Sequence, residues 1–308
     1  MNMEWRGVIP AMTTAFREDG TIDTDFVQRH LRWLLDNGCT GVVALGSLGE
    51  AAALAEEEKA QLLAACVKAA GARGPVVAGI SALSTCEAVR LAKIAEDAGC
   101  SGLMVLPPYV YRGDWRETKA HVTAILTATK LSCMLYNNPI AYQVDFVPEQ
   151  VQELVSENDN LHAIKESSAD VRRIMALSAL LGSRLKLLVG VDDAIVEAAL
   201  MGAEGWIAGL VNAFPRESVA LFDLAKSGKA REAMDLYRWF LPLLRMDTVP
   251  KFVQLIKLVQ EEVCAGSARV RAPRLELTGT ELEQARTAIA SALKARSAAH
   301  RSSAFPAD

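Results

Sequence analysis

Three short segments of the chain carry side chains that together suit Schiff-base chemistry. The first is Leu161-His162-Ala163-Ile164-Lys165, an apolar run that ends on a lysine. A strand here would bury the Lys165 amine, and burial lowers the pKa of an amine because it disfavours the charged form. A neutral lysine amine is the nucleophile that attacks ketones. Alternatively, Lys165 extends from the strand end and keeps its ammonium group in water.

The second segment, Tyr136-Asn137-Asn138-Pro139, also follows an apolar run. A tyrosine within hydrogen-bond reach of Lys165 would move protons to and from the carbon next to an imine. The alternative is a buried tyrosine whose hydroxyl has only a structural hydrogen bond. The segment therefore supplies a candidate acid/base, provided that Tyr136 lies beside Lys165.

The third segment is Gly46-Ser47-Leu48-Gly49-Glu50. Its two glycines permit a tight turn, and the inward backbone N–H groups of such a turn bind small carboxylates. Ser47 either relays a proton or caps the turn. An ordinary glycine-rich connection is the alternative for this motif.

The elements that must position these residues follow a regular order. Eight continuous apolar runs, typical of strands buried on both faces, alternate with amphipathic segments. This order predicts an α/β fold, a (β/α)8 TIM barrel, which carries its chemistry at the carboxyl ends of the strands. A doubly wound sheet is the structural alternative, but residues 10–14 lack its glycine fingerprint. The predicted strands are 7–12, 41–45, 76–79, 102–106, 132–136, 161–165, 185–189 and 205–208.

Helical patterns fill the intervals between the strands and the C-terminal part of the chain. We expect the catalytic barrel in residues 1–212, a C-terminal helical extension in 213–298, and a disordered tail in 299–308. The predicted helices are 25–36, 55–70, 87–98, 115–129, 148–155, 171–181, 194–201, 218–226, 231–244, 251–264 and 282–295.

The composition argues against several classes of partner. The net charge of −4 and the absence of a basic stripe argue against nucleic acid. No run approaches the ~18 apolar residues of a membrane span, and the N-terminus lacks the apolar region of a secretory signal. Six cysteines are scattered without paired spacing, which fits a reduced, cytoplasmic compartment.

A metal centre is not expected from the histidines and carboxylates. The four histidines (His30, His121, His162 and His300) show no ligand spacing. Asp192-Asp193 follows a predicted strand, where a carboxylate would cap the next helix or contact a cation or a substrate hydroxyl. Glu50 is expected to be a helix-start charge, and Arg269, Arg271 and Arg274 a solvated basic cluster.

Taken together, these motifs resemble the dihydrodipicolinate synthase/N-acetylneuraminate lyase family of class I aldolase-type barrels. The resemblance also includes residues 7–14, Gly190-Val191-Asp192-Asp193 and residues 205–209. In that family the matching lysine forms an imine with a 2-oxo acid, the tyrosine is the acid/base, and the glycine turn binds the carboxylate. The resemblance thus implies Lys165, Tyr136 and Ser47 as catalytic residues. It implies as substrate-binding residues Leu48, Gly49, Gly190 and Ile207.

Three departures distinguish the chain from the synthases of this family. Leu48 replaces a threonine in the turn, Val110 replaces a second relay tyrosine, and Ala141 replaces an arginine that binds the second substrate. Residues 107–111, 136–139, 212–217 and 237–244 are more similar to 1-pyrroline-4-hydroxy-2-carboxylate deaminases.

That subgroup implies deamination of 1-pyrroline-4-hydroxy-2-carboxylate, a hydroxyproline catabolite, to 2-oxoglutarate semialdehyde and ammonia. Asn138, Tyr109 and Tyr111 are then candidates for contacts with the substrate hydroxyl. No cofactor is expected, because the lysine imine is the electron sink, and the resemblance implies a homotetramer. The alternatives are an aldolase or dehydratase of 2-keto-3-deoxy sugar acids, the synthase itself, and a non-catalytic small-molecule sensor.

Overall fold

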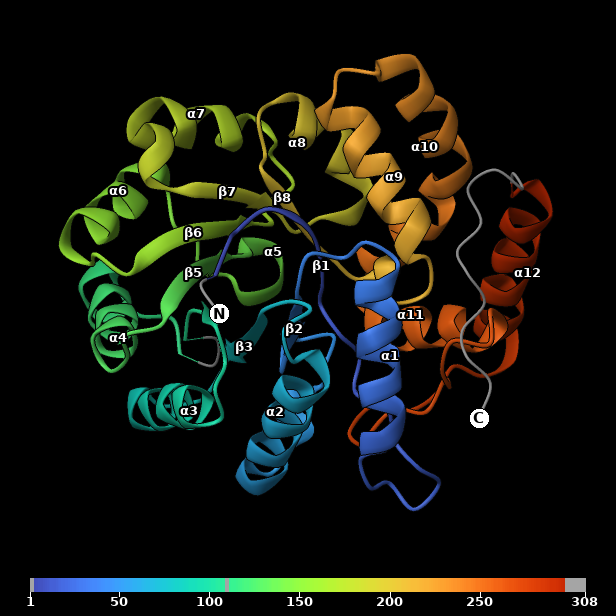
Figure 1. Cartoon of the computed structure of the whole chain (residues 1–308), viewed down its shortest axis with the longest axis horizontal. Helices are drawn as coiled ribbons and strands as arrows, with labels where there is room; N and C mark the ends of the chain where they lie inside the picture. Colours follow the sequence, from blue (N-terminus) through green and yellow to red (C-terminus); the bar gives the residue numbers. More distant parts are fainter. Residues whose placement is uncertain (1–2, 109–110, 297–308) are drawn as a thin grey trace.

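Eight parallel strands form the centre of the computed structural model, which describes residues 3–108 and 111–296 (Figure 1). The strands lie in the order β1-β8-β7-β6-β5-β4-β3-β2, and a parallel bridge between Ala11 and Val43 links the two ends of the sheet. The predicted (β/α)8 barrel is therefore confirmed. The strands are β1 (Gly7–Pro10), β2 (Val42–Ala44), β3 (Val76–Ile80), β4 (Gly102–Val105), β5 (Ser132–Asn137), β6 (Leu161–Glu166), β7 (Lys186–Val189) and β8 (Gly205–Ala208).

The strands form because their apolar runs can be buried on both faces, one against the barrel interior and one against helices. Every residue of β2, β3, β4 and β8 is buried. The one exposed strand residue of β6 is His162, near its amino end. The predicted strands agree with these bounds to within a few residues.

Helices surround the strands, and the helices of the C-terminal part of the chain lie together on one side of the barrel (Figure 1). Sequence patterns predicted all of the longer helices but missed the short α5, which begins at the proline after β5. The helices are α1 (Thr24–Asp36), α2 (Glu56–Ala70), α3 (Thr85–Asp97), α4 (Trp115–Thr127), α5 (Pro139–Tyr142), α6 (Pro148–Glu157), α7 (Arg172–Leu181), α8 (Ile195–Leu200), α9 (Pro215–Lys226), α10 (Ala230–Leu244), α11 (Phe252–Glu262) and α12 (Gly279–Ala295). Short 3-10 helices are η1 (Ala51–Ala53), η2 (Gly182–Arg184), η3 (Asp192–Ala194), η4 (Leu210–Asn212) and η5 (Arg245–Asp247).

Local capping explains where several helices begin. Asp114 accepts a hydrogen bond from the Glu117 backbone N–H at 2.9 Å, and the Glu117 carboxylate accepts one from the Asp114 N–H at 2.9 Å. This reciprocal pair satisfies two N–H groups that the first turn of α4 leaves without helical partners. At α3, the Ser84 hydroxyl accepts a hydrogen bond from the Glu87 N–H at 3.2 Å and so satisfies one such group.

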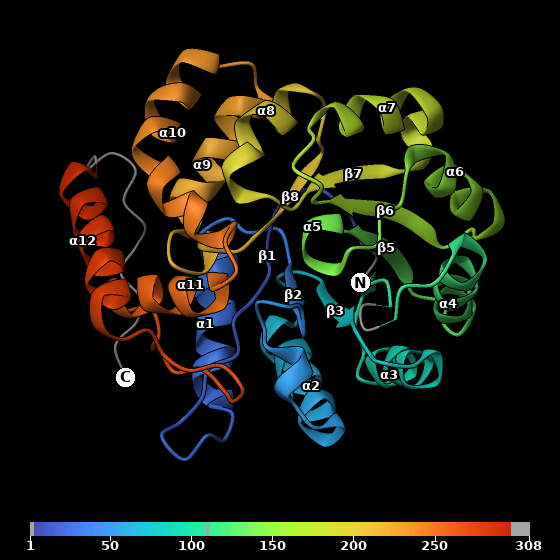
Figure 2. The ribbon, with the colours of Figure 1, turned by 180° about the vertical axis from the view of Figure 1, so that it is seen from behind.

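The C-terminal helices continue directly from the barrel. Helix α9 packs against α8 and β1 on one side and against α10 on the other. In Figure 2, α5 lies in front of the strands and α11 lies in front of α1. The boundary at residue 212 stays a prediction, and the predicted tail 299–308 lies outside the described residues. Within the described ranges, no helix is long and apolar enough to cross a membrane.

Candidate active site

Lys165 and Tyr136 lie side by side at the carboxyl ends of β6 and β5, where the strand register pairs them directly. Lys165 is only 6% exposed, and its Nζ lies 4.1 Å from the centroid of the Tyr136 ring. The alternative of an ammonium group extended into water is therefore wrong. Burial lowers the pKa of Lys165, while the nearby Asp247, Tyr142 and Asp192 act in the opposite direction. This setting favours the neutral amine that nucleophilic attack requires.

The Tyr136 hydroxyl is held by its own segment. Asn138 Nδ2 donates a hydrogen bond to it at 3.0 Å. Asn138 Oδ1 accepts a hydrogen bond from the Ala141 N–H and so caps the amino end of α5. Burial raises the pKa of Tyr136 to about 12, although hydrogen bonding to Asn138 lowers it. Asn138, predicted to contact substrate, thus positions the tyrosine hydroxyl in this structure.

Tyr142 supplies a hydroxyl group that the sequence analysis missed. The short helix α5 carries Tyr142 back over the strand ends, where its ring meets the Tyr136 ring edge-on at 5.7 Å. Its hydroxyl is hydrogen-bonded to Ser47 Oγ, and it also counteracts the raised pKa of Tyr136. Three hydroxyl groups from β5, α5 and the turn after β2 therefore form one cluster beside Lys165.

The turn after β2 is tightly packed at its glycines. A Cβ atom added at Gly49 would lie 2.9 Å from the Met12 carbonyl oxygen, so only glycine fits at this approach. Leu48 is buried, and Glu50 ends the turn in the left-handed region at φ 56°. Such a backbone conformation is unusual for a residue with a side chain and needs support from its surroundings.

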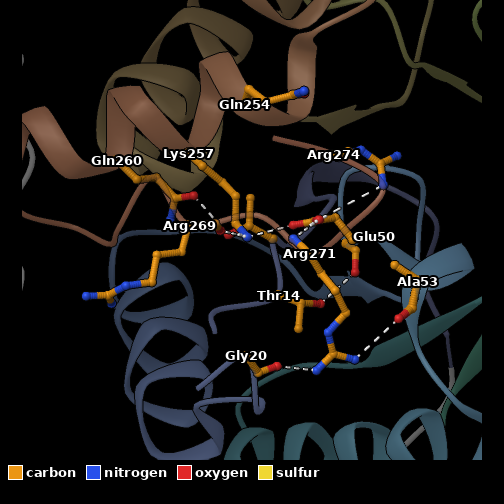
Figure 3. Close-up of polar contacts among 12 residues, drawn as sticks. Thr14, Gly20, Glu50, Ala53, Gln254, Lys257, Gln260, Arg269, Arg271 and Arg274 are labelled. Atoms are coloured by element: carbon orange, nitrogen blue, oxygen red, sulfur yellow. Dashed lines mark hydrogen bonds and ion pairs between the residues drawn. The ribbon is translucent and has the colours of Figure 1, made fainter. Parts of the chain in front are cut away.

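That support comes from a buried ion pair between Glu50 and Lys257 of α11 (Figure 3). The two side chains are 0% and 2% exposed, with Nζ 2.6 Å from Oε1. The Arg271 N–H donates to the other carboxylate oxygen at 2.9 Å, and the Arg274 guanidinium lies 4.0 Å away. Glu50 does precede the 3-10 helix η1, but its carboxylate is buried and paired and does not cap that helix. Of the three arginines, Arg271 and Arg274 contact Glu50, and Arg269, 42% exposed, fits the predicted solvated cluster. The C-terminal segment therefore fixes the turn.

Glycine at position 190 leaves room for the lysine. A Cβ atom there would lie 2.2 Å from Lys165 Cε and 2.1 Å from Ser167 Oγ. Gly190 therefore borders the Lys165 side chain, as expected for a residue that lines the pocket. Ile207 lies in β8 and is buried, which is compatible with the same predicted role.

Two carboxylates adjoin this region from the end of β7 and from η5. Asp192 is buried and accepts hydrogen bonds from Trp206 Nε1 at 3.0 Å and from the Gly209 and Leu210 N–H groups at 3.1 and 2.8 Å. It therefore fixes the loop after β8 and does not cap α8, whose amino end has no side-chain cap. Burial raises the pKa of Asp192 to about 6. Asp247 has a buried Oδ1 atom without a hydrogen bond among the described residues.

The structure does not bring all predicted residues to Lys165. Tyr111 is 62% exposed, and its hydroxyl donates to the Glu117 carboxylate at 3.1 Å. Tyr109 and Val110 lie outside the described residues.

Among the residues that the structure does describe, no group of three or more histidine, cysteine or acidic side chains is placed to hold a metal ion.

Sequence and structure comparisons give a consistent result. Residues 4–295 match the Dihydrodipicolinate synthetase family. A 4-hydroxy-tetrahydrodipicolinate synthase from Shewanella sp. (strain W3-18-1) is 34% identical over 230 residues, covering 75% of this chain and 78% of that protein.

Two solved structures are similar along nearly their whole length. The 4-hydroxy-tetrahydrodipicolinate synthase of Methylacidiphilum fumariolicum SolV has a TM-score of 0.90 and 29% identity, covering 94% of this chain and 97% of that chain. The dihydrodipicolinate synthase of Acinetobacter baumannii, solved with pyruvate, has a TM-score of 0.88 and 28% identity, covering 94% and 99%.

Proposed function

The chain belongs to the dihydrodipicolinate synthetase family of class I aldolase-type lyases, and from this premise we propose that Lys165 forms its Schiff base. The observation that carries the proposal is the burial of Lys165 against Tyr136, which favours a neutral amine beside an acid/base. The amine attacks C2 of a 2-oxo acid or of its cyclic imine. The resulting iminium withdraws electrons from C3 and acidifies its protons.

Binding of the C1 carboxylate is assigned to the turn after β2. Backbone N–H groups of Ser47 and Leu48 suit this role, because neither needs a side chain to donate. Gly49 allows the tight turn, and the Glu50–Lys257 pair holds it in place. Leu48 has no hydroxyl, so carboxylate recognition at that position depends on the backbone alone.

Proton transfer at C3 is assigned to the three clustered hydroxyl groups. The Tyr136 ring lies 4.1 Å from the Lys165 amine, and the Tyr142–Ser47 hydrogen bond extends the cluster. A chain of hydroxyls passes a proton on without separating charge in a buried site. Tyr142 thus takes the place of the relay tyrosine whose position is occupied by Val110.

The proposed substrate is 1-pyrroline-4-hydroxy-2-carboxylate. Attack of Lys165 at C2 opens the ring, loss of the C3 proton gives an enamine, and the 4-hydroxyl leaves as water. A proton then moves from C5 to C3 and a second proton adds to C4, so that the C5 amine becomes an imine. Two water molecules hydrolyse the imines at C2 and C5, which frees Lys165 and releases ammonia and 2-oxoglutarate semialdehyde. The reaction needs no cofactor, since the imine is the electron sink.

Ala141 supports a deaminase over a synthase. It occupies the position at which the synthases carry an arginine for their second substrate, and an alanine cannot donate the paired hydrogen bonds of a guanidinium. A synthase activity remains the first alternative because the relatives carry that name. The second alternative is an aldolase or dehydratase of 2-keto-3-deoxy sugar acids. Both alternatives keep Lys165 as the nucleophile.

The test is ammonia release from 1-pyrroline-4-hydroxy-2-carboxylate, with Lys165→Ala as the control. Release that disappears in the variant supports the proposal, whereas turnover of a sugar-derived acid or condensation with a semialdehyde instead would replace the substrate. A wild type that binds 2-oxo acids without turning any over would indicate a sensor.

By resemblance to the family, we also propose that the protein is a homotetramer in the cytoplasm and takes part in hydroxyproline catabolism. Light scattering tests the homotetramer, cell fractionation tests the cytoplasmic location, and growth of a deletion strain on hydroxyproline tests the part in catabolism.

A further inference from the structure

Asp247 is a half-buried residue with one fully buried carboxyl oxygen, and the mechanism above does not use it. It ends η5, which connects α10 to the segment before α11, and η5 packs against η3 at the end of β7. Its Oδ1 atom is buried and accepts no hydrogen bond from any described residue. A buried carboxylate oxygen without a donor is costly, so the position calls for a functional explanation.

Two glycines leave the space that Asp247 and Lys165 occupy. A Cβ atom at Gly209 would lie 2.0 Å from Asp247 Oδ1, and one at Gly190 would lie 2.2 Å from Lys165 Cε. Gly209 follows β8 and Gly190 follows β7, and these two strands are hydrogen-bonded neighbours. The Asp247 carboxyl group and the lysine therefore lie at neighbouring strand ends, close enough for their charges to interact.

Of the two acids Asp192 and Asp247, Asp247 is the one whose surroundings favour the protonated form more strongly. Asp192 receives three N–H donors, which favour its ionised form. No described residue donates to Asp247 Oδ1, and the pKa of Asp247 lies well above its ordinary value because of burial and the nearby Asp192 charge. Lys165 acts in the opposite direction, but a neutral amine would exert little of that effect.

We propose that Asp247 is the general acid that protonates the 4-hydroxyl group of the substrate as it leaves. This inference rests on the proposed function. The enamine electrons form the C3–C4 double bond, the C4–O bond breaks, and the oxygen takes the Asp247 proton to leave as water. The enamine becomes a cationic iminium on Lys165 while Asp247 becomes an anion beside it. Hydroxide is a poor leaving group, so this step needs an acid.

The test compares two leaving groups in Asp247→Asn, a variant of nearly unchanged shape. With the 4-hydroxy substrate, we expect ammonia release to fall by about 100-fold or more, the usual effect of removing a general acid. With the 4-fluoro analogue, fluoride leaves without a proton, so fluoride release should stay close to the wild-type rate. Borohydride trapping of pyruvate at Lys165 should also persist, which shows that the site is folded and forms the imine.

Several outcomes would overturn the assignment. Unchanged ammonia release in Asp247→Asn, or equal losses with both leaving groups, would show that Asp247 does not protonate the hydroxyl. If Asp247→Asn fails to trap pyruvate, Gly209→Ala is used instead, because its added methyl group displaces the Asp247 carboxyl group. Gly209→Ala must then slow ammonia release from the 4-hydroxy substrate but not fluoride release from the 4-fluoro analogue. Loss of pyruvate trapping in both variants also refutes the role. A wild type that traps pyruvate but turns over neither substrate refutes the proposed function, and with it this step. Asp193→Asn is the matched control, since Asp193 pairs with Arg245 at 3.6 Å and should behave as wild type.

Discussion

Replacing Lys257 with methionine should destabilise the protein through Glu50, 207 residues away in the sequence. Methionine retains most of the packing volume but leaves the fully buried Glu50 carboxylate without its cation. Breaking a buried ion pair from one side costs about 3–5 kcal/mol. The Arg271 N–H still donates to Glu50 at 2.9 Å, so we expect a value near the lower limit.

The expected change in melting temperature follows from the size of the chain. At roughly 2 cal/mol/K per residue, 308 residues give an unfolding entropy of roughly 0.65 kcal/mol/K, so the variant should melt roughly 5 °C lower. The KM for a 2-oxo acid should rise as well, because the turn that holds its carboxylate loses its anchor. Thermal melts followed by circular dichroism, together with steady-state kinetics, measure both effects.

Two further variants make this test specific. Lys251→Met removes a surface partner of Glu281, with both side chains about half exposed, and should change the stability by less than about 1 kcal/mol. Adding Glu50→Gln to Lys257→Met removes the buried charge and should recover part of the lost stability. Equal melting temperatures for Lys257→Met and Lys251→Met would refute the reasoning that the buried pair fixes the turn.

Three other changes have defined outcomes. Tyr142→Phe should slow exchange of the C3 protons of bound pyruvate by roughly 10²-fold or more while leaving borohydride trapping intact, and an unchanged exchange rate by NMR would remove Tyr142 from the relay. Gly190→Ala should abolish trapping without unfolding the protein, since its Cβ atom would lie 2.2 Å from Lys165 Cε, and normal trapping would contradict that contact. Burial lowers the pKa of His30 from 6.5 to about 4, so on acidification the imidazole is protonated in the unfolded chain before it is protonated in the folded protein. The free energy of unfolding should therefore fall by up to roughly 3 kcal/mol as the pH drops from about 6.5 to 4. His30→Gln should reduce that slope in urea titrations, and an identical slope would show that the histidine does not cause it.

Strand ends made Lys165 and Tyr136 predictable. Each residue ends a run that is apolar enough to be a strand, and parallel strands present their carboxyl ends at one edge. Neighbouring strands then place the two residues next to each other, which the register confirms. The barrel itself followed from the same continuous apolar runs, because their order and number allow few other arrangements.

The contacts that depend on irregular segments could not be predicted in this way. Tyr142 reaches Ser47 only because a single helical turn begins at Pro139, and the sequence pattern there is too short to show periodicity. Asp247 and Lys257 come from beyond the barrel, and no local pattern reveals which strand end they meet. The sequence pattern therefore indicates no role for either residue, whereas the fold buries Lys257 against Glu50 and places Asp247 beside the loop after β8.

The most direct test of the central claim is to trap the imine. The protein is incubated with pyruvate and borohydride, digested, and analysed by peptide mass spectrometry. The account predicts a reduced pyruvate adduct on the peptide that contains Lys165, and no adduct there in the variant Lys165→Ala. Labelling at another lysine, or none at all, would contradict the assignment of Lys165 as the Schiff-base residue.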